Sequence, residues 1–293
     1  YGLPYYAARV IREAIDRHPQ WRFTLISSRD TVPYDGIEQL VGGGVHWVDA
    51  KEVASWTKLG VPVPDVFIIT SWPHIAYQSL AREAKASQRS HVVCMVDNYL
   101  RHTPKQLVGY FYFRLVLRDL YSAVWVPGAY SRRFLRYLGM PEDRIYEGLY
   151  AADPDLFFSP AGNAPRGGFV FVGQLIERKG VLPLADVFEQ SGSAQALKLI
   201  GHGPLEPILK ARGLAVESFR QPRELGEIYR SASFLILPSY IDHWGVVAHE
   251  AALCGCLIIV TKHCGCAGDL VQHGVNGYIM ETSSFAEIEK ALD

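Results

Sequence analysis

Residues 234–261, FLILPSYIDHWGVVAHEAALCGCLIIVT, contain two apolar segments separated by a glycine and a helical pattern. The segments FLILPS and LIIVT are short and nearly continuous, which is typical of strands buried on both faces of a parallel sheet. A helix is predicted between them, starting at Gly245. A strand, a helix and a second strand form the repeating unit of α/β folds, and ligands of such folds bind beyond the carboxyl ends of the strands. This stretch therefore predicts the fold class and the edge of the sheet where a site would lie.

The same alternation of strands and helices runs through both halves of the chain and predicts two doubly wound parallel sheets. Residues 150–168 lack periodicity and are rich in Pro, Gly and Asp, so they are predicted to link two domains. We place the amino-terminal domain at 1–155 and the carboxyl-terminal domain at 156–293. Because Tyr1-Gly2 is typical of the middle of a loop, we expect the first strand of the first domain to precede residue 1.

Composition limits the classes of function. The 293 residues are 49% hydrophobic and 20% charged, as in ordinary globular proteins. A formal net charge of −1 gives no overall attraction to nucleic acid, so no nucleic-acid partner is expected. No apolar run approaches the ~20 residues that span a bilayer. Five cysteines, an odd number, favour a reducing compartment, and we expect a cytoplasmic protein.

Two glycine-containing turns follow strands of the second half. Lys179, beside Gly180 and just before a helix, could contact an anion at the free helix amides, although a solvated lysine in a turn explains that motif better when it is taken alone. Gly201 and Gly203 would let the backbone approach a ligand closely, but a simple tight turn explains them equally well.

Two carboxylates in the opening stretch give the strongest signal. Asp242 follows a strand, and Glu250 lies about one and a half turns into the next helix. Carboxylates accept hydrogen bonds only, so they suit ligands rich in hydroxyls, while the free amides near residues 244–247 suit phosphate or sugar oxygens. The alternative is that Asp242 caps the helix and Glu250 is an exposed helix residue. The glycine turn and the position at a strand end favour a site.

Several motifs, in order, resemble one family. The segments FVGQLIERKGV, LIGHGPL, LGEIYRSASFLILPSYIDHWGVVAHEAALCG and GDLVQHGVNGYIM look like the donor domain of the family 4 glycosyltransferases, retaining enzymes of the two-domain GT-B fold. The segment AVWVPGAYSRRFLRYLGMPEDRIYEGLYAADPDLFF resembles the end of that family's acceptor domain and its linker. The resemblance implies the GT-B fold, two Rossmann-like domains facing each other across a cleft.

The resemblance also implies residue roles. Lys179 would contact the diphosphate of a nucleotide sugar, Glu250 would bind the ribose hydroxyls, and Asp242 would contact the transferred hexose. Asp97, at the end of a strand of the first domain, is the best candidate there for a contact to the acceptor or the hexose. We predict the catalytic residues Asp97, Lys179 and Asp242, and the donor-binding residues Gly2, Gly173, Gln174, Arg178, Lys179, Gly201, His202, Gly203, Asp242, Trp244, Gly245, Val246, Val247 and Glu250.

Two positions depart from the family. Gln174 stands where the family usually has an arginine, so one of two cations expected at the diphosphate is missing, and Arg178 could substitute from a different direction. Asp242 stands where the family usually has a glutamate, which is one methylene longer. Both departures leave open a weakened enzyme.

No metal or other cofactor is predicted. Asp153-Pro-Asp155 spells an Asp-x-Asp pattern, but it lies in the linker. Cys254-Gly-Cys256 and Cys264-Gly-Cys266 have shorter gaps than the usual zinc spacing.

Residues 101–136 form a basic segment, with seven Lys and Arg against one acid, Asp119. Its cations are mixed with aromatic residues, which suits anionic lipid headgroups or a lipid-linked phosphate acceptor. The alternative is a core helix with a solvated basic side.

The sequence thus predicts a retaining, metal-independent glycosyltransferase that moves a hexose from a nucleotide-diphosphate sugar to a saccharide or lipid-linked acceptor. It would act in the synthesis of cell-surface polysaccharide or glycolipid, in the cytoplasm or peripherally on the inner membrane face. The alternatives are a nucleotide-sugar epimerase of the same fold and a catalytically weak nucleotide-sugar binding module.

Overall fold

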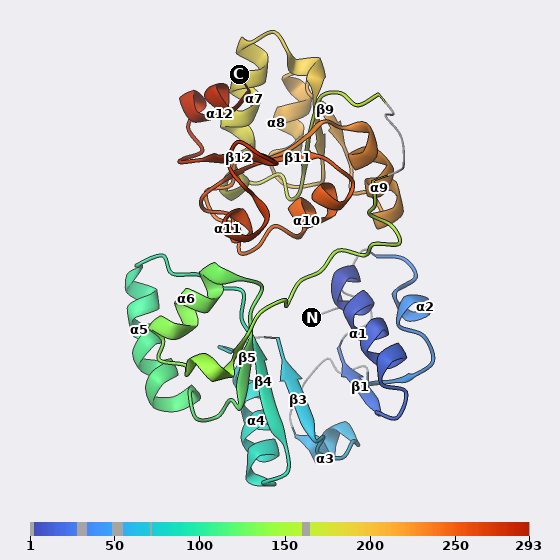
Figure 1. Cartoon of the computed structure of the whole chain (residues 1–293), viewed down its shortest axis with the longest axis vertical. Helices are drawn as coiled ribbons and strands as arrows, with labels where there is room; N and C mark the ends of the chain where they lie inside the picture. Colours follow the sequence, from blue (N-terminus) through green and yellow to red (C-terminus); the bar gives the residue numbers. More distant parts are fainter. Residues whose placement is uncertain (1–2, 28–33, 49–54, 71, 160–164, 293) are drawn as a thin grey trace. The chain divides into compact units, whose positions relative to one another are not determined.

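The computed structural model describes residues 3–27, 34–48, 55–70, 72–159 and 165–292, and the chain forms two compact units, Tyr1–Ala151 and Ala152–Asp293 (Figure 1). The division falls after residue 151, close to the predicted boundary at 155. Among the described residues, no helix is both long and apolar enough to cross a membrane.

The first unit contains parallel strands covered by helices. Its strands are β1 (Phe23–Ile26), β2 (Val45–Val48), β3 (Val66–Ile69), β4 (His91–Met95), β5 (Ala123–Trp125) and β6 (Ile145–Tyr146). Its helices are α1 (Tyr5–Arg17), α2 (Ile37–Val41), α3 (Trp56–Leu59), α4 (Ile75–Ala86), α5 (Pro104–Tyr112), the π-helical η1 (Phe113–Leu117), α6 (Ala129–Tyr137) and the 3₁₀ turn η2 (Glu142–Arg144).

In the described part of this unit the strands fall into two sheets rather than one. β1 pairs with β2, and β3 to β6 form a four-stranded sheet in chain order. The core of the larger sheet includes buried Val92, Cys94 and Val124 from its strands, packed with Phe113 and Leu117 of η1. A separate core of Leu3, Ala8, Ile37 and Val41 joins α1 to α2.

The second unit is built on one six-stranded parallel sheet. Its strands are β7 (Phe169–Val172), β8 (Leu197–Ile200), β9 (Ala215–Glu217), β10 (Phe234–Leu237), β11 (Leu257–Thr261) and β12 (Gly277–Met280). Its helices are η3 (Glu177–Lys179), α7 (Val181–Gln190), η4 (Ala194–Ala196), α8 (Glu206–Ala211), α9 (Pro222–Ser231), α10 (Val246–Leu253), α11 (Ala267–Leu270) and α12 (Phe285–Leu292). α12 packs beside α7, and α10 packs beside α9.

The strand order in this sheet is β12-β11-β10-β7-β8-β9. From β7 the chain moves outward through β8 to β9, returns to β10 on the other side of β7, and moves outward again through β11 to β12. This is the order of a doubly wound nucleotide-binding fold, in which ligands bind where the order reverses. Phe234 of β10 pairs with Phe169 of β7. The loops that follow β7 and β10 therefore meet at the switch point.

Candidate functional site

A buried ion pair lies at the switch point. The Nζ atom of Lys179 in η3 donates to Oδ2 of Asp242 in the loop after β10, at 2.5 Å. The two side chains are 13% and 11% exposed. The structure thus brings together two of the three predicted catalytic residues, a pairing that was not predicted from the sequence.

Backbone contacts fix the two loops that carry this pair. The amide of Tyr240 donates to the carbonyl of Arg178 at 3.0 Å, and the guanidinium of Arg178 donates to the carbonyl of Ile241 at 2.7 Å. Gly180 has a φ of +69°, and a Cβ there would lie 1.9 Å from the carbonyl oxygen of Pro238. Gly180 is therefore required by the contact between the loops. Arg178 was predicted as a possible substitute cation, and one N–H of its guanidinium is used in the hydrogen bond to the carbonyl of Ile241.

A third loop, between β11 and α11, supports Asp242 from the other side. The amide of Asp242 donates to the carbonyl of His263 at 3.1 Å, and the amide of Gly265 donates back to the carbonyl of Asp242 at 2.9 Å. A Cβ on Gly265 would lie only 1.8 Å from the carbonyl oxygen of His243. The backbone around Asp242 is thus held on both sides.

Replacing Gly265 by alanine should lower the free energy of unfolding by about 2–3 kcal/mol, because the added methyl forces two close backbone segments apart. Gly167→Ala is the matched control, since a Cβ at Gly167 meets nothing within 4 Å. Chemical denaturation of the two variants measures the difference. Equal stability would show that the loop around Gly265 yields without cost.

Gly245, with a φ of +86°, is the residue before α10, and no described side chain caps this helix. The cap alternative for Asp242 is therefore wrong, because its carboxylate pairs with Lys179 instead. In an α-helix the first amides have no acceptor within the helix, and Val246 and Val247 hold these positions in α10. Together with the positive end of the helix dipole, they form a suitable anion site. Trp244, directly before Gly245, is buried, with 5% of its surface exposed.

Glu250, farther along α10, is half-buried, so the alternative of an exposed helix residue is also wrong. The hydroxyl of Tyr229, fully buried in α9, donates to Oε2 of Glu250 at 3.2 Å. Burial raises the pKa of Glu250 to about 7, although the hydrogen bond from Tyr229 acts in the opposite direction. A carboxylate in this setting gains from further hydrogen-bond donors, as the hydroxyls of a ligand would be. Tyr229 was missed from sequence, where it appears as one apolar position of a helix.

The glycine turns after β7 and β8 pack against each other. A Cβ on Gly201 would lie 1.9 Å from the carbonyl oxygen of Gly173, and a Cβ on Gly203 would lie 2.4 Å from that of Leu175. The close approach that these glycines allow is therefore between two protein loops, and the tight-turn interpretation accounts for them. The side chains of Gln174 and His202 are exposed at this edge.

Asp97 follows β4 in the first unit and is surrounded by tyrosines. The hydroxyl of Tyr150 donates to its Oδ2 at 3.1 Å, and the rings of Tyr6 and Tyr150 meet edge to face at 5.1 Å. Burial raises the pKa of Tyr6 to about 12, and the hydrogen bond with Tyr150 acts in the opposite direction. Neither tyrosine was predicted from sequence as part of a site. Gly2, predicted to lie near the diphosphate, falls outside the described residues.

The candidate metal ligands have other surroundings. The carboxylate of Asp153 accepts from the amide of Asp155 at 3.0 Å within the linker turn. The cysteines are all free and buried, and burial raises the pKa of Cys256 and of Cys264 to about 12, which keeps these thiols protonated. Among the described residues, no three His, Cys, Asp or Glu side chains form a metal-binding group.

Comparison with known proteins finds a family match in the second unit. Residues 166–293 match the family described as Glycosyl transferases group 1. Over 130 residues the chain is 28% identical to an uncharacterized glycosyltransferase of Methanocaldococcus jannaschii, and over 131 residues it is 29% identical to one of Haemophilus influenzae. These alignments span 42% of this chain and only 36% and 37% of those proteins.

Solved structures resemble the whole chain. HepE of Anabaena, solved in complex with UDP and glucose, matches with a TM-score of 0.71 and 17% identity, over 99% of this chain and 86% of HepE. WaaG, a glycosyltransferase involved in lipopolysaccharide biosynthesis, matches with a TM-score of 0.63 and 14% identity, over 100% of this chain and 87% of WaaG. The chain has the GT-B fold, as the sequence predicted.

Proposed function

We propose that this protein is a retaining glycosyltransferase that transfers a hexose from a nucleotide-diphosphate sugar to a saccharide or lipid-linked acceptor. The observation that carries the proposal is the Lys179–Asp242 pair at the sheet's switch point, beside the free amides of α10. It lies within the part of the chain that matches a glycosyltransferase family. Because HepE was solved with UDP-glucose, a uridine diphosphate sugar is the first donor to test.

The diphosphate would lie against the amides of Val246 and Val247, with Lys179 supplying a positive charge. As the bond to the sugar breaks, negative charge develops on the leaving diphosphate, and donors already in place stabilise it without rearrangement. An arriving diphosphate would also compete with Asp242 for Lys179. That exchange would free the Asp242 carboxylate to accept hydrogen bonds from hexose hydroxyls.

Glu250 would hold the other end of the donor. Its carboxylate accepts from Tyr229 on one oxygen and can accept ribose hydroxyls with its remaining lone pairs. In the first unit, the Asp97 carboxylate and the oxygen of the Tyr150 hydroxyl that donates to it both offer acceptors for sugar hydroxyls. We propose Asp97 as the contact to the acceptor or to the hexose.

Transfer from this donor class should proceed in excess EDTA, because the charge at the proposed diphosphate site comes from Lys179 and helix amides. Purified protein would be incubated with a panel of UDP-, GDP- and TDP-sugars, with and without saccharide acceptors, and products identified by mass spectrometry. Acceptor-dependent transfer supports the proposal. Activity that chelation abolishes and Mn²⁺ restores would contradict metal independence, and conversion of the donor without any acceptor would point to an epimerase.

A second part of the proposal concerns the basic segment 101–136. The residues of α5 and η1 are all described, and none of those in α5 is buried. Their exposed side chains are mainly apolar: Leu107, Val108, Phe111, Tyr112, Leu115 and Val116. Lys105 and Arg114 lie on the same helical segment, whereas Arg118 and Arg132 are engaged by neighbouring carboxylates. Apolar side chains flanked by cations suit the surface of an anionic membrane, where a lipid-linked acceptor would be found.

The protein should therefore sediment with anionic vesicles and be released as the salt concentration rises, since screening weakens the attraction. Leu115 is 80% exposed, and Leu115→Glu should reduce this binding. Val275→Glu, at a side chain 73% exposed in the second unit, is the matched control. Equal sedimentation with neutral and anionic vesicles, or equal loss in both variants, would contradict the membrane contact.

A further inference from the structure

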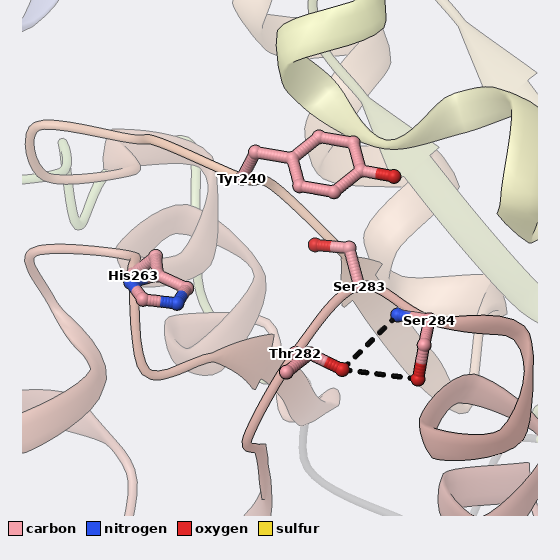
Figure 2. A pocket seen from close by; sticks show the side chains of 5 residues that line it. All are labelled: Tyr240, His263, Thr282, Ser283 and Ser284. Carbon is pink, nitrogen blue, oxygen red and sulfur yellow. Dashed lines mark hydrogen bonds between the residues drawn. The ribbon is translucent and has the colours of Figure 1, made fainter.

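A pocket of about 450 Å³ opens at the carboxyl ends of β10, β11 and β12 in the second unit, within the size range of small-molecule sites. The loop after β10 contributes Tyr240, the loop after β11 contributes His263, and the turn before α12 contributes Thr282, Ser283 and Ser284 (Figure 2). None of these five residues belongs to the proposed nucleotide-sugar site. The pocket's lining combines one aromatic ring, one imidazole and three hydroxyls.

Ser283 gives the first indication of a ligand. It is 1% exposed, and its Oγ atom has no hydrogen-bond partner among the described residues. Figure 2 shows this hydroxyl directed into the space between Tyr240 and His263. A buried hydroxyl that lacks a partner is unfavourable. A ligand with hydroxyl groups would supply the missing partner.

The surroundings disfavour an anion. At the start of α12, the amide of Ser284 donates to Oγ1 of Thr282 at 3.3 Å, and the amide of Glu287 donates to Oγ of Ser284 at 3.4 Å. These amides are therefore occupied by hydroxyls of the turn itself. The Glu287 carboxylate also lies at this end of the helix, where it accepts from the amide of Glu281 at 3.0 Å. A phosphate entering the pocket would therefore meet the negative charge of Glu287, and the amides of Ser284 and Glu287 would not be free to bind it.

Tyr240 supplies an apolar surface beside these polar groups. Its side chain is 50% exposed, and its backbone is fixed by the hydrogen bond to Arg178. A ring of this kind stacks against the apolar C–H face of a pyranose, while hydroxyl and imidazole groups match the sugar's hydroxyls. We propose that this pocket binds a neutral saccharide unit, at a site separate from Lys179, Asp242 and Glu250. The proposal holds whether or not the protein transfers sugars.

The test uses the full chain and four probes, D-glucose, D-galactose, D-mannose and N-acetyl-D-glucosamine, measured by saturation-transfer difference NMR and titration calorimetry. At least one should bind, and both Ser283→Ala and Tyr240→Ala should weaken that binding by about tenfold, as expected for one lost hydrogen bond or stacking contact. Tyr240→Phe, which keeps the ring, should retain most of the affinity.

Ser283→Ala removes a hydroxyl that has no described partner, so its melting temperature should equal or exceed that of the wild type. Ser90→Ala is the matched control, because Ser90 also has a buried hydroxyl without a described partner but lies in the first unit. Its saccharide affinity should be unchanged. The proposal is overturned if no probe binds, if binding survives in both Ser283→Ala and Tyr240→Ala, or if Asp242→Asn abolishes it while Ser283→Ala does not. Binding of inorganic phosphate that is lost in Ser283→Ala would equally overturn the assignment to a neutral ligand.

Discussion

Replacing Lys179 by alanine is expected to lower the free energy of unfolding by about 3 kcal/mol and to remove most of the affinity for a nucleoside diphosphate. The first effect follows from burial: Asp242, 11% exposed on its side chain, would be left charged and without its cation. Removing one member of a buried pair is costly because the remaining charge keeps its desolvation penalty. The second effect follows from the proposed role of Lys179 as the cation at the diphosphate.

The double variant Lys179→Met with Asp242→Asn separates the two effects. It leaves no unpaired charge, so it should recover most of the stability while still binding the diphosphate poorly. Lys290→Ala, which removes an exposed lysine of α12, is the matched control and should change stability and UDP affinity much less. Chemical denaturation and calorimetry with UDP provide the measurements. Unchanged diphosphate affinity in Lys179→Ala would exclude Lys179 from the site even if stability falls as expected.

Replacing Glu250 by glutamine should stabilise the protein at neutral and alkaline pH and weaken nucleotide binding. The folded-state pKa of Glu250 is raised from 4.5 to about 7, so the folded protein favours the protonated form. The favourable contribution of this group is complete below pH 4.5 and is lost as the pH rises to about 7. The side chain of glutamine does not ionise, so the Glu250→Gln variant does not lose this stability as the pH rises. Its advantage in unfolding free energy should therefore grow across this window to about 2 kcal/mol, after allowance for partial exposure.

Nucleotide binding should favour the ionised form of Glu250, whereas folding favours the protonated form. In the proposed complex, ribose hydroxyls would donate to the ionised carboxylate, so affinity for a nucleoside diphosphate should fall in the wild type as the pH drops below about 7. Glutamine at position 250 should weaken binding by ~1.5–3 kcal/mol, the scale for hydrogen bonds to a charged group. If the affinity of the wild type and that of Glu250→Gln change with pH in the same way, that shared change comes from titration of the phosphate groups of the ligand. Glu227→Gln, exposed on α9, is the control. Wild-type affinity in Glu250→Gln at pH 8 would disprove the ribose assignment.

The sequence predicted those elements whose pattern is local and strong. FLILPS and LIIVT became β10 and β11 because continuous apolar runs need burial on both faces. The strands β2, β6, β9 and β12 were not predicted, since a strand of two to four residues carries little or no period. β2 also has exposed His46 between its half-buried positions, and among the described strands it pairs with β1 alone.

Site residues were predicted as individuals, but their partners were not. The pair between Lys179 and Asp242 joins positions 63 residues apart, and only the return of the chain to β10 beside β7 brings them together. Tyr229 and Tyr150 likewise act through contacts with Glu250 and Asp97 that no spacing rule contains. For Gly201 and Gly203 the sequence left open a close approach to a ligand or a tight turn, and the structure shows a close approach to the carbonyl oxygens of Gly173 and Leu175.

The central place of β7 has a consequence for synthesis on the ribosome. β7 is the first strand of its sheet to emerge, yet one of its two neighbours, β10, follows more than sixty residues later. Until then only β8 and β9 are available to it, so the edge formed by Phe169 and Val170, which later pairs with β10, stays open. An open strand edge pairs readily with other chains. The nascent protein is therefore most exposed to misassembly in the interval before residues 234–237 leave the ribosome, and the same step that closes this edge brings Asp242 to Lys179.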